Sequence, residues 1–300
     1  MHFLSIDDVS KEQMNEIFHI SDDISRMKEE ISLREDTTLA LLFEKPSTRT
    51  RLSFEVAMAK LGGRCIYIDS KNSQMSRGES LADTAKVMSL YVDFIAARMY
   101  KHDDLVEFAK NSSVPVINAL TDREHPTQAL ADLYTILSKK KKLKGLRIAF
   151  VGDTAQNTAN SLMLAAVKMG AEMALIGPKS FLPDALYVTK AREYGVVDTY
   201  DTLKEGLAGA DVVYTDTFVS MGTEKEADNR KKLFANYQIN GNALQYAKKD
   251  VIVMHPLPAF RGEEITAEVL DGPRSVVWEQ SRNKRITIQA MLVFLSEKER

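Results

Sequence analysis

Short apolar runs alternate with segments of helical periodicity along the chain, and this alternation constrains the fold more than any other feature of the sequence. The runs are rich in Val, Ile, Leu and Ala, which is typical of strands that are buried on both faces. A helical segment follows almost every run, so successive strands are joined by crossovers and are predicted to be parallel. The sequence therefore predicts an α/β protein.

The predicted elements form two successive sets. In the first set, strands are predicted at 38–43, 64–68, 93–97 and 115–118. The helices of that set are predicted at 7–29, 49–61, 80–90, 103–110 and 125–138. In the second set, strands are predicted within 146–153, 172–177, 211–218, 250–257 and 276–280. Its helices are predicted near 157–169, 183–194, 241–248 and 285–298.

Two sets of this kind predict two doubly wound parallel-sheet domains, joined by the helix near 125–138. In such folds a small molecule binds by default in the cleft between domains, at the carboxyl ends of the strands. The polar segments of this chain do follow predicted strands, at 44–51, 98–102, 118–128, 216–222 and 255–262. We therefore expect the functional site in that cleft.

The composition argues against several classes of protein. A net charge of −2 over 300 residues gives no basic excess for binding nucleic acids or anionic membranes in general. The only cysteine, Cys65, leaves no internal disulfide or cysteine-based zinc site, and its place in a predicted strand favours a buried structural thiol. The N-terminus does not resemble a signal peptide, and no apolar run approaches about 20 residues. We expect a cytoplasmic protein.

The first polar segment crowds hydroxyls and arginines between a strand and a helix, as Ser47–Thr48–Arg49–Thr50–Arg51. A helix N-terminus offers free backbone N–H groups and partial positive charge. With two hydroxyls and a guanidinium added, it can bind a phosphate and a neighbouring carbonyl oxygen together. The same residues also suit an ordinary helix cap with surface arginines. Chemistry alone favours neither interpretation.

The helix that follows this turn is predicted to begin near Thr48, with Ser47 or Thr48 as its cap. Leu52, Val56 and Ala59 follow helical spacing and are predicted to share its buried face. The pair of glycines at 62–63 is predicted to end it.

Three later segments also carry polar side chains. His125 and Gln128 share a face at a helix start, where an imidazole and an amide could polarise a carbonyl, although a plain capping turn with Pro126 is the simpler alternative. Asp216 ends a strand and could receive an ammonium group, or serve turn chemistry alone. His255 lies in a segment stiffened by two prolines, which could be only a rigid loop.

Taken together, these segments resemble the transcarbamylase family. The motifs "STRTR" after a strand, "RMYKH", "HPTQ" and "HPLP" occur in the family's order and at similar separations over essentially the whole chain. The resemblance implies two α/β domains, one for carbamoyl phosphate and one for the amino substrate. It also implies a catalytic trimer with active sites at subunit boundaries, and no cofactor or metal. The domains are expected at 1–134 for carbamoyl phosphate and 135–284 for the amino acid, with a C-terminal helix at 285–300 packing back on the first.

Within the family the chain looks most similar to the ornithine branch. The segment "DTFVSMGTE" resembles the ornithine enzyme's Ser-Met-Gly loop, and Asp216 suits a cationic amino acid. The implied reaction is transfer of the carbamoyl group to the side-chain amine of ornithine, giving citrulline and phosphate in arginine metabolism. The alternative is aspartate carbamoylation, which "HPTQALADLYTI" and "HPLP" favour.

The resemblance assigns site residues by position. Carbamoyl phosphate is expected to bind Ser47, Thr48, Arg49, Thr50, Gln74 (from a neighbouring subunit), Arg98, His125, Gln128 and Lys284. Ornithine is expected to bind Asn118, Asp216, Ser220, Met221, His255 and Leu257. The candidates for stabilising the developing oxyanion are Arg49, Thr50 and His125.

Two positions depart from the family pattern. Pro256 stands where the ornithine branch has a cysteine, and this form is reminiscent of the aspartate branch. The family has an arginine in an Asn-Arg pair before the last helix, and an ungapped match puts Lys284 at that position, with Arg285 one residue further on. A lysine has the positive charge of an arginine without its planar guanidinium.

Two other classes fit less well. A nicotinamide oxidoreductase would need G-x-G-x-x-G after a strand, and "AFVGDTAQNTAN" has only Gly152. A binding paralogue without turnover would not need Arg49, Arg98, His125 and Gln128 together.

Overall fold

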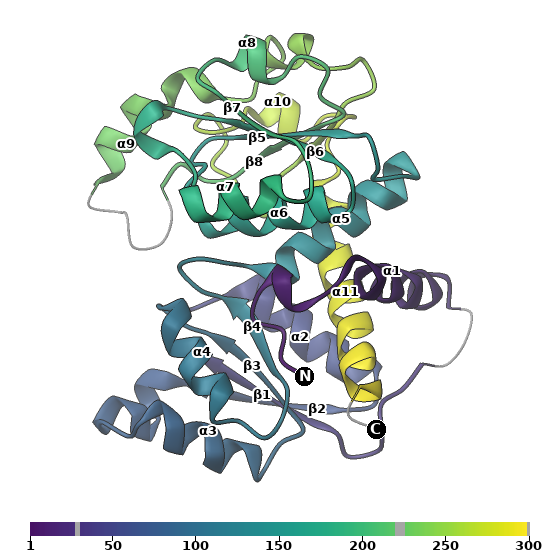
Figure 1. Cartoon of the computed structure of the whole chain (residues 1–300), viewed down its shortest axis with the longest axis vertical. Coiled ribbons are helices and arrows are strands. Elements are labelled where there is room, and N and C mark those ends of the chain that lie inside the picture. The colour runs from purple at the N-terminus through teal and green to yellow at the C-terminus, as the bar shows by residue number, and fades with distance from the viewer. Residues whose placement is uncertain (28–30, 220–225, 299–300) are drawn as a thin grey trace. The chain divides into compact units, whose positions relative to one another are not determined.

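The structure is a computed structural model that describes residues 1–27, 31–219 and 226–298. The chain divides into two compact units (Figure 1). Unit 1 comprises residues 1–131 and 282–300, and unit 2 comprises residues 132–281. Each unit is built around its own parallel sheet.

The sheet of unit 1 has four strands in the order β2-β1-β3-β4. All of its pairings are parallel, and the strands are β1 (Thr38–Phe43), β2 (Arg64–Asp69), β3 (Phe94–Arg98) and β4 (Val116–Leu120). The strand order reverses between β1 and β3, because β2 lies on one side of β1 and β3 on the other. The carboxyl ends of strands at such a reversal are the usual place for a ligand.

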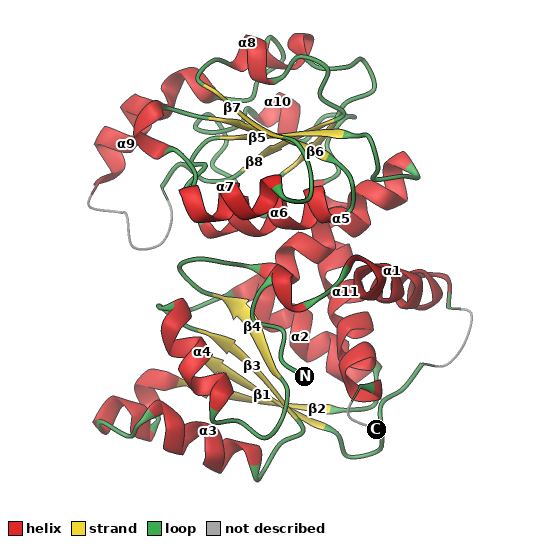
Figure 2. Cartoon of the chain, viewed as in Figure 1, coloured by secondary structure: helices red, strands yellow, loops and turns green. Residues whose placement is uncertain are grey.

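Helices cover both faces of this sheet (Figure 2). They are α1 (Lys11–Arg26), α2 (Thr48–Lys60), α3 (Leu81–Ser89), α4 (His102–Lys110), the start of α5 (Pro126–Lys140) and the later part of α11 (Val277–Glu297). Short 3-10 turns are η1 (Ile6–Asp8), η2 (Ser70–Asn72) and η3 (Gln74–Arg77). The helix predicted over 7–29 is divided, because Ser10 forms a capping box with Gln13 and starts α1 there.

The core of unit 1 follows the alternation of its strands. Leu39, Leu41 and Phe43 of β1 face one side of the sheet, while Ala40 and Leu42 face the other, and all five are buried. The second group packs in a cluster with apolar residues of α3 and α4. A strand that is buried on both faces reads as a continuous apolar run, which is why its predicted bounds agree with the observed ones.

The predicted buried face of α2 was wrong. Leu52, Val56 and Ala59 are exposed, and the buried residues are Thr50, Ser53, Phe54, Ala57 and Met58. These five also follow helical spacing, and the larger Phe54 and Met58 determine which side faces the core. Two consequences follow: Thr50 points inward, and an apolar stripe of α2 stays uncovered within the chain.

The sheet of unit 2 has five parallel strands in the order β7-β6-β5-β8-β9. The strands are β5 (Arg147–Val151), β6 (Glu172–Ile176), β7 (Val197–Tyr200), β8 (Val212–Thr215) and β9 (Ile252–Met254). Here the order reverses between β5 and β8. Together the two sheets confirm the predicted α/β class with parallel sheets.

The helices of unit 2 include the rest of α5 and the start of α11. The others are α6 (Asn157–Lys168), α7 (Ala185–Arg192), α8 (Leu203–Gly206), α9 (Ala227–Phe234) and α10 (Ala267–Leu270), with the 3-10 turns η4 (Lys179–Phe181), η6 (Ala235–Tyr237) and η7 (Ala243–Tyr246). The helix predicted near 241–248 is only η7, and β7, α8, α9 and α10 were not predicted. These missed elements are short and carry little periodicity.

The strand predicted at 276–280 was also wrong. Val276 donates a backbone hydrogen bond to Val253, and α11 begins at the next residue. Val276, Val277 and Gln280 are buried, whereas Trp278 and Glu279 are exposed, which is a helical pattern. Two adjacent valines favour a strand in isolation, and their burial against the sheet overrides that preference.

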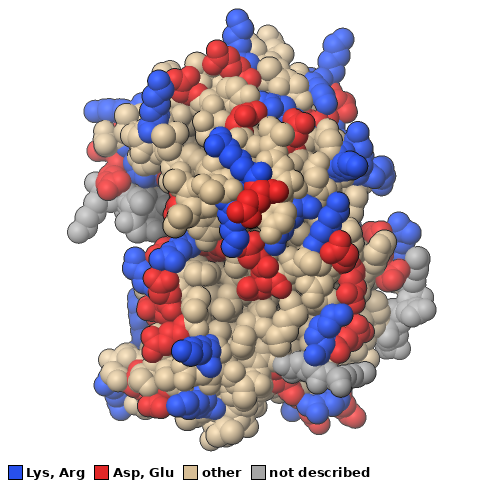
Figure 3. All heavy atoms as spheres, in the orientation of Figure 1, with Lys and Arg blue, Asp and Glu red and all other residues tan. Residues whose placement is uncertain are grey.

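No helix in the described parts of the chain is long and apolar enough to cross a membrane. On the face in Figure 3, acidic and basic side chains are interspersed rather than gathered by sign.

Candidate functional site

The turn between β1 and α2 lies beside the end of β3, at the strand reversal of unit 1. Phe43, the last residue of β1, pairs with Arg98, the last residue of β3. Helix α2 starts at Thr48, as predicted, and Ser47 is its N-cap residue. The Ser47 side chain makes no capping hydrogen bond, so its hydroxyl is not committed to the helix backbone. The turn thus combines a helix N-terminus with hydroxyl donors, which suits an oxyanion.

Arg98 gives this corner of unit 1 a buried positive charge. Its side chain is 4% exposed, and its Nε has no hydrogen-bond partner among the described residues. Burial, together with the smaller effect of the nearby Arg49 guanidinium, lowers the pKa of Arg98 to about 10. A buried guanidinium with an unused donor, close enough to a second, partly exposed guanidinium to be repelled by it, is an arrangement that an anion would stabilise.

A second cation near Arg98 was missed by sequence reasoning. Burial lowers the pKa of Lys45, and repulsion by Arg98 adds to that effect. The Lys45 ammonium lies 4.6 Å from the centre of the Tyr100 ring. The signal was available in the sequence, because Lys45 directly precedes the Pro46 of the same turn.

Lys284 connects α11 to the same cluster. Its Nζ lies 3.0 Å from Thr50 Oγ1 and 3.2 Å from His125 Nε2. All three residues are nearly fully buried. Of the two late basic residues, Lys284 reaches Thr50 and His125, while the partly buried Arg285 pairs with Gln289, one turn further along α11.

His125 and Gln128 lie at the start of α5, which begins at Pro126 as predicted. Both side chains are buried, and the Gln128 backbone N–H donates to the His125 carbonyl. Burial, followed by the charges of Lys284 and Arg98, lowers the pKa of His125 well below its usual value. His125 is thus a neutral imidazole around pH 7.

Arg51 differs from Arg49, two residues earlier. Its guanidinium lies 3.8 Å from the centre of the Tyr67 ring, and its Nε donates to Glu55 at 2.8 Å. This arginine serves the packing of α2 on β2.

Two other residues assigned to unit 1 lie in different settings. Asn118 is buried in the middle of β4, where its amide donates to the Leu4 carbonyl at 2.8 Å and accepts from the Leu120 N–H at 2.9 Å. In this structure Asn118 holds β4 and the N-terminal segment in place. Gln74 begins η3 and is exposed, so its side chain is accessible from outside the chain.

In unit 2, Asp216 follows β8 directly. Its Oδ1 accepts a hydrogen bond from the Thr217 N–H at 2.7 Å. Burial raises the pKa of the Asp216 carboxyl above its usual value. A carboxylate that has lost part of its hydration is stabilised by an incoming ammonium group, so Asp216 is suited to a cationic ligand.

His255 follows β9 and is fully buried in a hydrogen-bond network. Its Nδ1 accepts from the Leu257 N–H at 2.9 Å, so Nε2 carries the proton and donates to Glu264 Oε1 at 3.0 Å. The His255 N–H donates to Gln280 at 2.9 Å, and Glu264 also accepts from the Phe260 N–H at 2.6 Å. Glu264 and Gln280 therefore fix the 255–260 loop, and sequence reasoning missed both.

The backbone of this loop is unusual at Leu257, whose φ of 59° lies in the left-handed region. Leu257 precedes Pro258, and this peptide bond is cis. His255 thus orients the loop through the Leu257 N–H, and Pro256 between them supplies no N–H of its own.

Ser220 and Met221 lie outside the described residues. The segments on either side are joined by Arg230 of α9, whose Nε donates to the Phe218 carbonyl at 2.6 Å. Its guanidinium forms a buried ion pair with Asp153 and lies over the rings of Phe181 and Phe234. No sequence signal marked this pair, because its partners are far apart in the chain.

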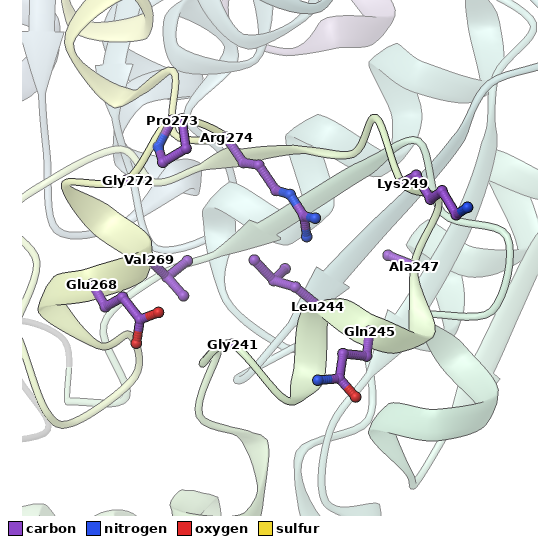
Figure 4. A pocket seen from close by; sticks show the side chains of 10 residues that line it. All are labelled: Gly241, Leu244, Gln245, Ala247, Lys249, Glu268, Val269, Gly272, Pro273 and Arg274. Atoms are coloured by element: carbon purple, nitrogen blue, oxygen red, sulfur yellow. The ribbon is translucent and has the colours of Figure 1, made fainter.

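Unit 2 also has an open pocket of about 480 Å³ (Figure 4). Apolar side chains of Leu244 and Val269 form part of its lining, and Arg274, Lys249 and Glu268 are the charged residues around it. The three charged residues are exposed. This pocket includes none of the residues that the sequence singled out.

Family models match nearly the whole chain. Residues 1–138 match the model described as "Aspartate/ornithine carbamoyltransferase, carbamoyl-P binding domain". Residues 144–295 match "Aspartate/ornithine carbamoyltransferase, Asp/Orn binding domain".

Individual relatives agree with the family models. The ornithine carbamoyltransferase of Anoxybacillus flavithermus is 44% identical, covering 98% of this chain and 96% of the relative. The anabolic ornithine carbamoyltransferase of Pyrococcus furiosus is 46% identical, covering 88% of this chain and 85% of the relative. A solved structure of the Pyrococcus furiosus enzyme has a TM-score of 0.93 at 43% identity, over 97% of this chain and 95% of that one.

Proposed function

The chain belongs to the aspartate/ornithine carbamoyltransferase family, and we propose that it transfers the carbamoyl group of carbamoyl phosphate to the side-chain amine of ornithine. The products are citrulline and phosphate. The relatives named ornithine carbamoyltransferase support this choice of acceptor, and the anabolic name of one supports the direction toward arginine.

The observation that carries the proposal is the buried cationic corner of unit 1. Arg98, with a free Nε donor, and Arg49 meet at the N-terminus of α2, beside the uncommitted hydroxyl of Ser47. A phosphate would satisfy these donors and relieve the repulsion between the guanidiniums. We assign the phosphate to Ser47, Thr48, Arg49 and Arg98, and the carbamoyl group to Thr50, His125, Gln128 and Lys284.

Ornithine is assigned to unit 2. Asp216 is the proposed partner of its α-ammonium group, and the raised pKa of its carboxyl supports that role, because an ammonium group would stabilise the ionised form. Ser220, Met221 and Asn118 are also proposed to bind ornithine, and His255 and Leu257 shape the loop after β9.

The chemistry needs neither a covalent enzyme intermediate nor an activated side chain, since the nucleophile is already an amine. The neutral side-chain nitrogen of ornithine attacks the carbonyl carbon and forms the C–N bond, and the electron pair of the C=O bond moves to oxygen. Collapse then breaks the bond from carbon to the phosphate oxygen, and the attacking nitrogen gives up a proton. Catalysis is positioning plus stabilisation of the oxyanion, for which Arg49, Thr50 and the His125–Lys284 pair are the candidates.

A second acceptor is supported by one observation. Pro256 occupies the position of the ornithine branch's cysteine, in the form reminiscent of the aspartate branch. Aspartate would bring a second carboxylate to unit 2, where Asp216 would repel it. Ornithine is therefore the acceptor that the charge of this residue favours.

We also propose that the enzyme is a trimer, or a multiple of trimers, with shared active sites. Exposed apolar side chains of unit 1 support an interface there; they are Leu52 and Val56 of α2, Ile66 of the edge strand β2, and Val87, Leu90 and Tyr91 in and after α3. Gln74, exposed in η3, is the proposed contribution to a neighbouring site. Cys65 forms no disulfide within the chain, which is in keeping with the cytoplasm as its proposed location.

A ureido-product assay with ornithine, aspartate and putrescine in parallel tests the proposed function. Ornithine should give the largest kcat/KM by orders of magnitude. Arg49→Ala should lower kcat by about 10²-fold or more while leaving the circular dichroism spectrum unchanged. Preference for aspartate, or near-normal turnover by the variant, would refute the assignment.

A further inference from the structure

Lys284 joins three segments of unit 1 that are far apart in the sequence. Lys284 lies on α11, and its Nζ donates to the Thr50 hydroxyl of α2 at 3.0 Å and lies 3.2 Å from His125 Nε2, just before α5. The lysine is 6% exposed, and Thr50 and His125 are buried with it. A buried lysine needs polar partners, and these two contacts satisfy part of that need.

The contact with His125 has a defined direction. A lysine ammonium carries three donors and no acceptor, so the His125 nitrogen that it meets must accept. That nitrogen is Nε2, and therefore the proton of the imidazole lies on Nδ1. Nδ1 in turn lies 3.4 Å from the hydroxyl of Thr127, which can accept it.

The charges around His125 act in the same direction. Lys284 faces the ring from α11, and Arg98 faces it from the end of β3. Both are cationic and oppose a second proton on the imidazole, in addition to the effect of burial. Geometry and charge therefore agree on a single protonation state.

We propose that Lys284 is a positioning residue, which holds His125 as a neutral imidazole protonated on Nδ1 and ties it to Thr50. Its importance for catalysis rests on the proposed function, since His125 and Thr50 are there assigned to the carbamoyl group. In that site the Lys284 ammonium supplies the positive charge beside the carbamoyl group. The His125 imidazole accepts a hydrogen bond from this ammonium and so orients it.

Nitrogen-15 NMR of histidine-labelled protein tests the proposal without any substrate. The His125 signals are assigned by loss in His125→Asn. In the wild type they should show Nδ1 protonated and Nε2 unprotonated from about pH 5 to pH 8. A proton on Nε2, or a doubly protonated ring across that range, would overturn the proposal.

Three substitutions separate the charge of Lys284 from its hydrogen bond. Lys284→Met removes both, so the pKa of His125 should rise by about one pH unit or more and the tautomers should mix. Lys284→Gln keeps a donor without charge, so the pKa should rise while Nε2 still accepts. Lys284→Arg keeps both and should preserve the wild-type signals. If Lys284→Met does not fold, Lys284→Gln carries the test, and an unchanged pKa there overturns the proposal.

Kinetics then connect this arrangement to turnover. Lys284→Met should lower kcat by about 10²-fold and add a new acidic ionisation to the pH profile, and Lys284→Arg should restore most of the rate. Lys298→Met is the matched control, because this lysine follows α11 and is exposed beside Glu16.

Absence of carbamoyl transfer by the wild type would refute the proposed function alone, since the NMR result does not depend on it. A merely structural Lys284 would lower stability without moving the pH profile, and that result would overturn its positioning role.

Discussion

At the scale of single residues, the candidate anion site depends on the cation of Arg98, which is buried before any anion arrives. Burial and the Arg49 guanidinium both lower the pKa of Arg98, so its guanidinium stays charged at neutral pH but is less stable there than it would be in water. Binding sites often keep such unfavourable arrangements, because the ligand relieves them. Arg98 is therefore the residue at which stability and function should oppose each other.

Arg98→Met should raise KM for carbamoyl phosphate by about 10²-fold or more, since a charge-assisted pair with phosphate is lost. The same variant should have an equal or higher Tm without ligand, because a buried, repelled charge is removed. Steady-state kinetics and calorimetry measure the two effects. Arg51→Met is the matched control, and it should keep KM because Arg51 contacts Tyr67 and Glu55 instead. A lower Tm with unchanged KM in Arg98→Met would contradict the account.

Asp216 makes a prediction about pH. Its folded-state pKa is raised above 3.8 by burial, so ionised Asp216 destabilises the folded state, and this penalty develops as the pH rises from about 3.8 through the raised value. Asp216→Asn should therefore raise the Tm at neutral pH while raising KM for ornithine. Thermal unfolding from pH 4 to pH 8 measures the first effect. If the wild type and the variant have parallel stability curves over that range, the raised pKa is wrong.

At the scale of elements, Arg230 fastens α9 to the ends of two strands. It pairs with Asp153 after β5 and donates to Phe218 after β8, and both contacts are buried. Arg230→Met should lower the free energy of unfolding by about 3 to 5 kcal/mol, because Asp153 is left as a buried, unpaired charge. Urea denaturation measures this change.

Lys231→Met is the control for that experiment. Lys231 is the next residue of α9 and pairs with Glu263 at the surface, where an ion pair contributes little. It should unfold like the wild type. Adding Asp153→Asn to Arg230→Met should recover part of the lost free energy of unfolding, because the unpaired carboxylate is then removed. If the double variant loses as much free energy as the two single variants together, an unpaired charge is not the cause.

The sequence predicts these elements unevenly, for physical reasons. The bounds of β1 are correct to the residue, because a strand buried on both faces is a continuous apolar run between polar turns. The start of α11 was missed, because Val276–Val277 carries no period of its own and its partner Val253 is distant in the chain. The buried face of α2 was inverted, because Leu52 and Val56 are apolar yet exposed, so apolar spacing alone did not identify the side that Phe54 and Met58 bury.

The candidate site follows the same rule. Ser47–Thr48–Arg49–Thr50 could be found because a helix N-terminus and its donors are contiguous. Arg230, Glu264 and Gln280 could not, because their roles depend on partners that only the fold brings near. A polar residue whose partner is remote leaves no pattern in the local sequence.

At the scale of the whole molecule, the uncovered apolar residues of unit 1 predict an assembly. Ile66 lies on the edge strand β2 with 48% exposure, and Leu90 and Tyr91 are more exposed still. Ile66→Lys together with Leu90→Glu should convert a trimer to a monomer and lower activity, if Gln74 serves a neighbouring site. Light scattering after size exclusion measures the mass. A monomeric wild type, or a fully active monomeric variant, would contradict the shared-site proposal.

The central claim is that this chain carries a carbamoyl group from phosphate to ornithine. The most direct measurement uses carbamoyl phosphate labelled at its carbonyl carbon, with ornithine and aspartate supplied together at equal concentration, and follows labelled products and phosphate over time. We predict that label leaves as citrulline in a one-to-one ratio with enzyme-dependent phosphate release. Label in carbamoyl-aspartate instead, or phosphate release without a labelled ureido product, would contradict the claim.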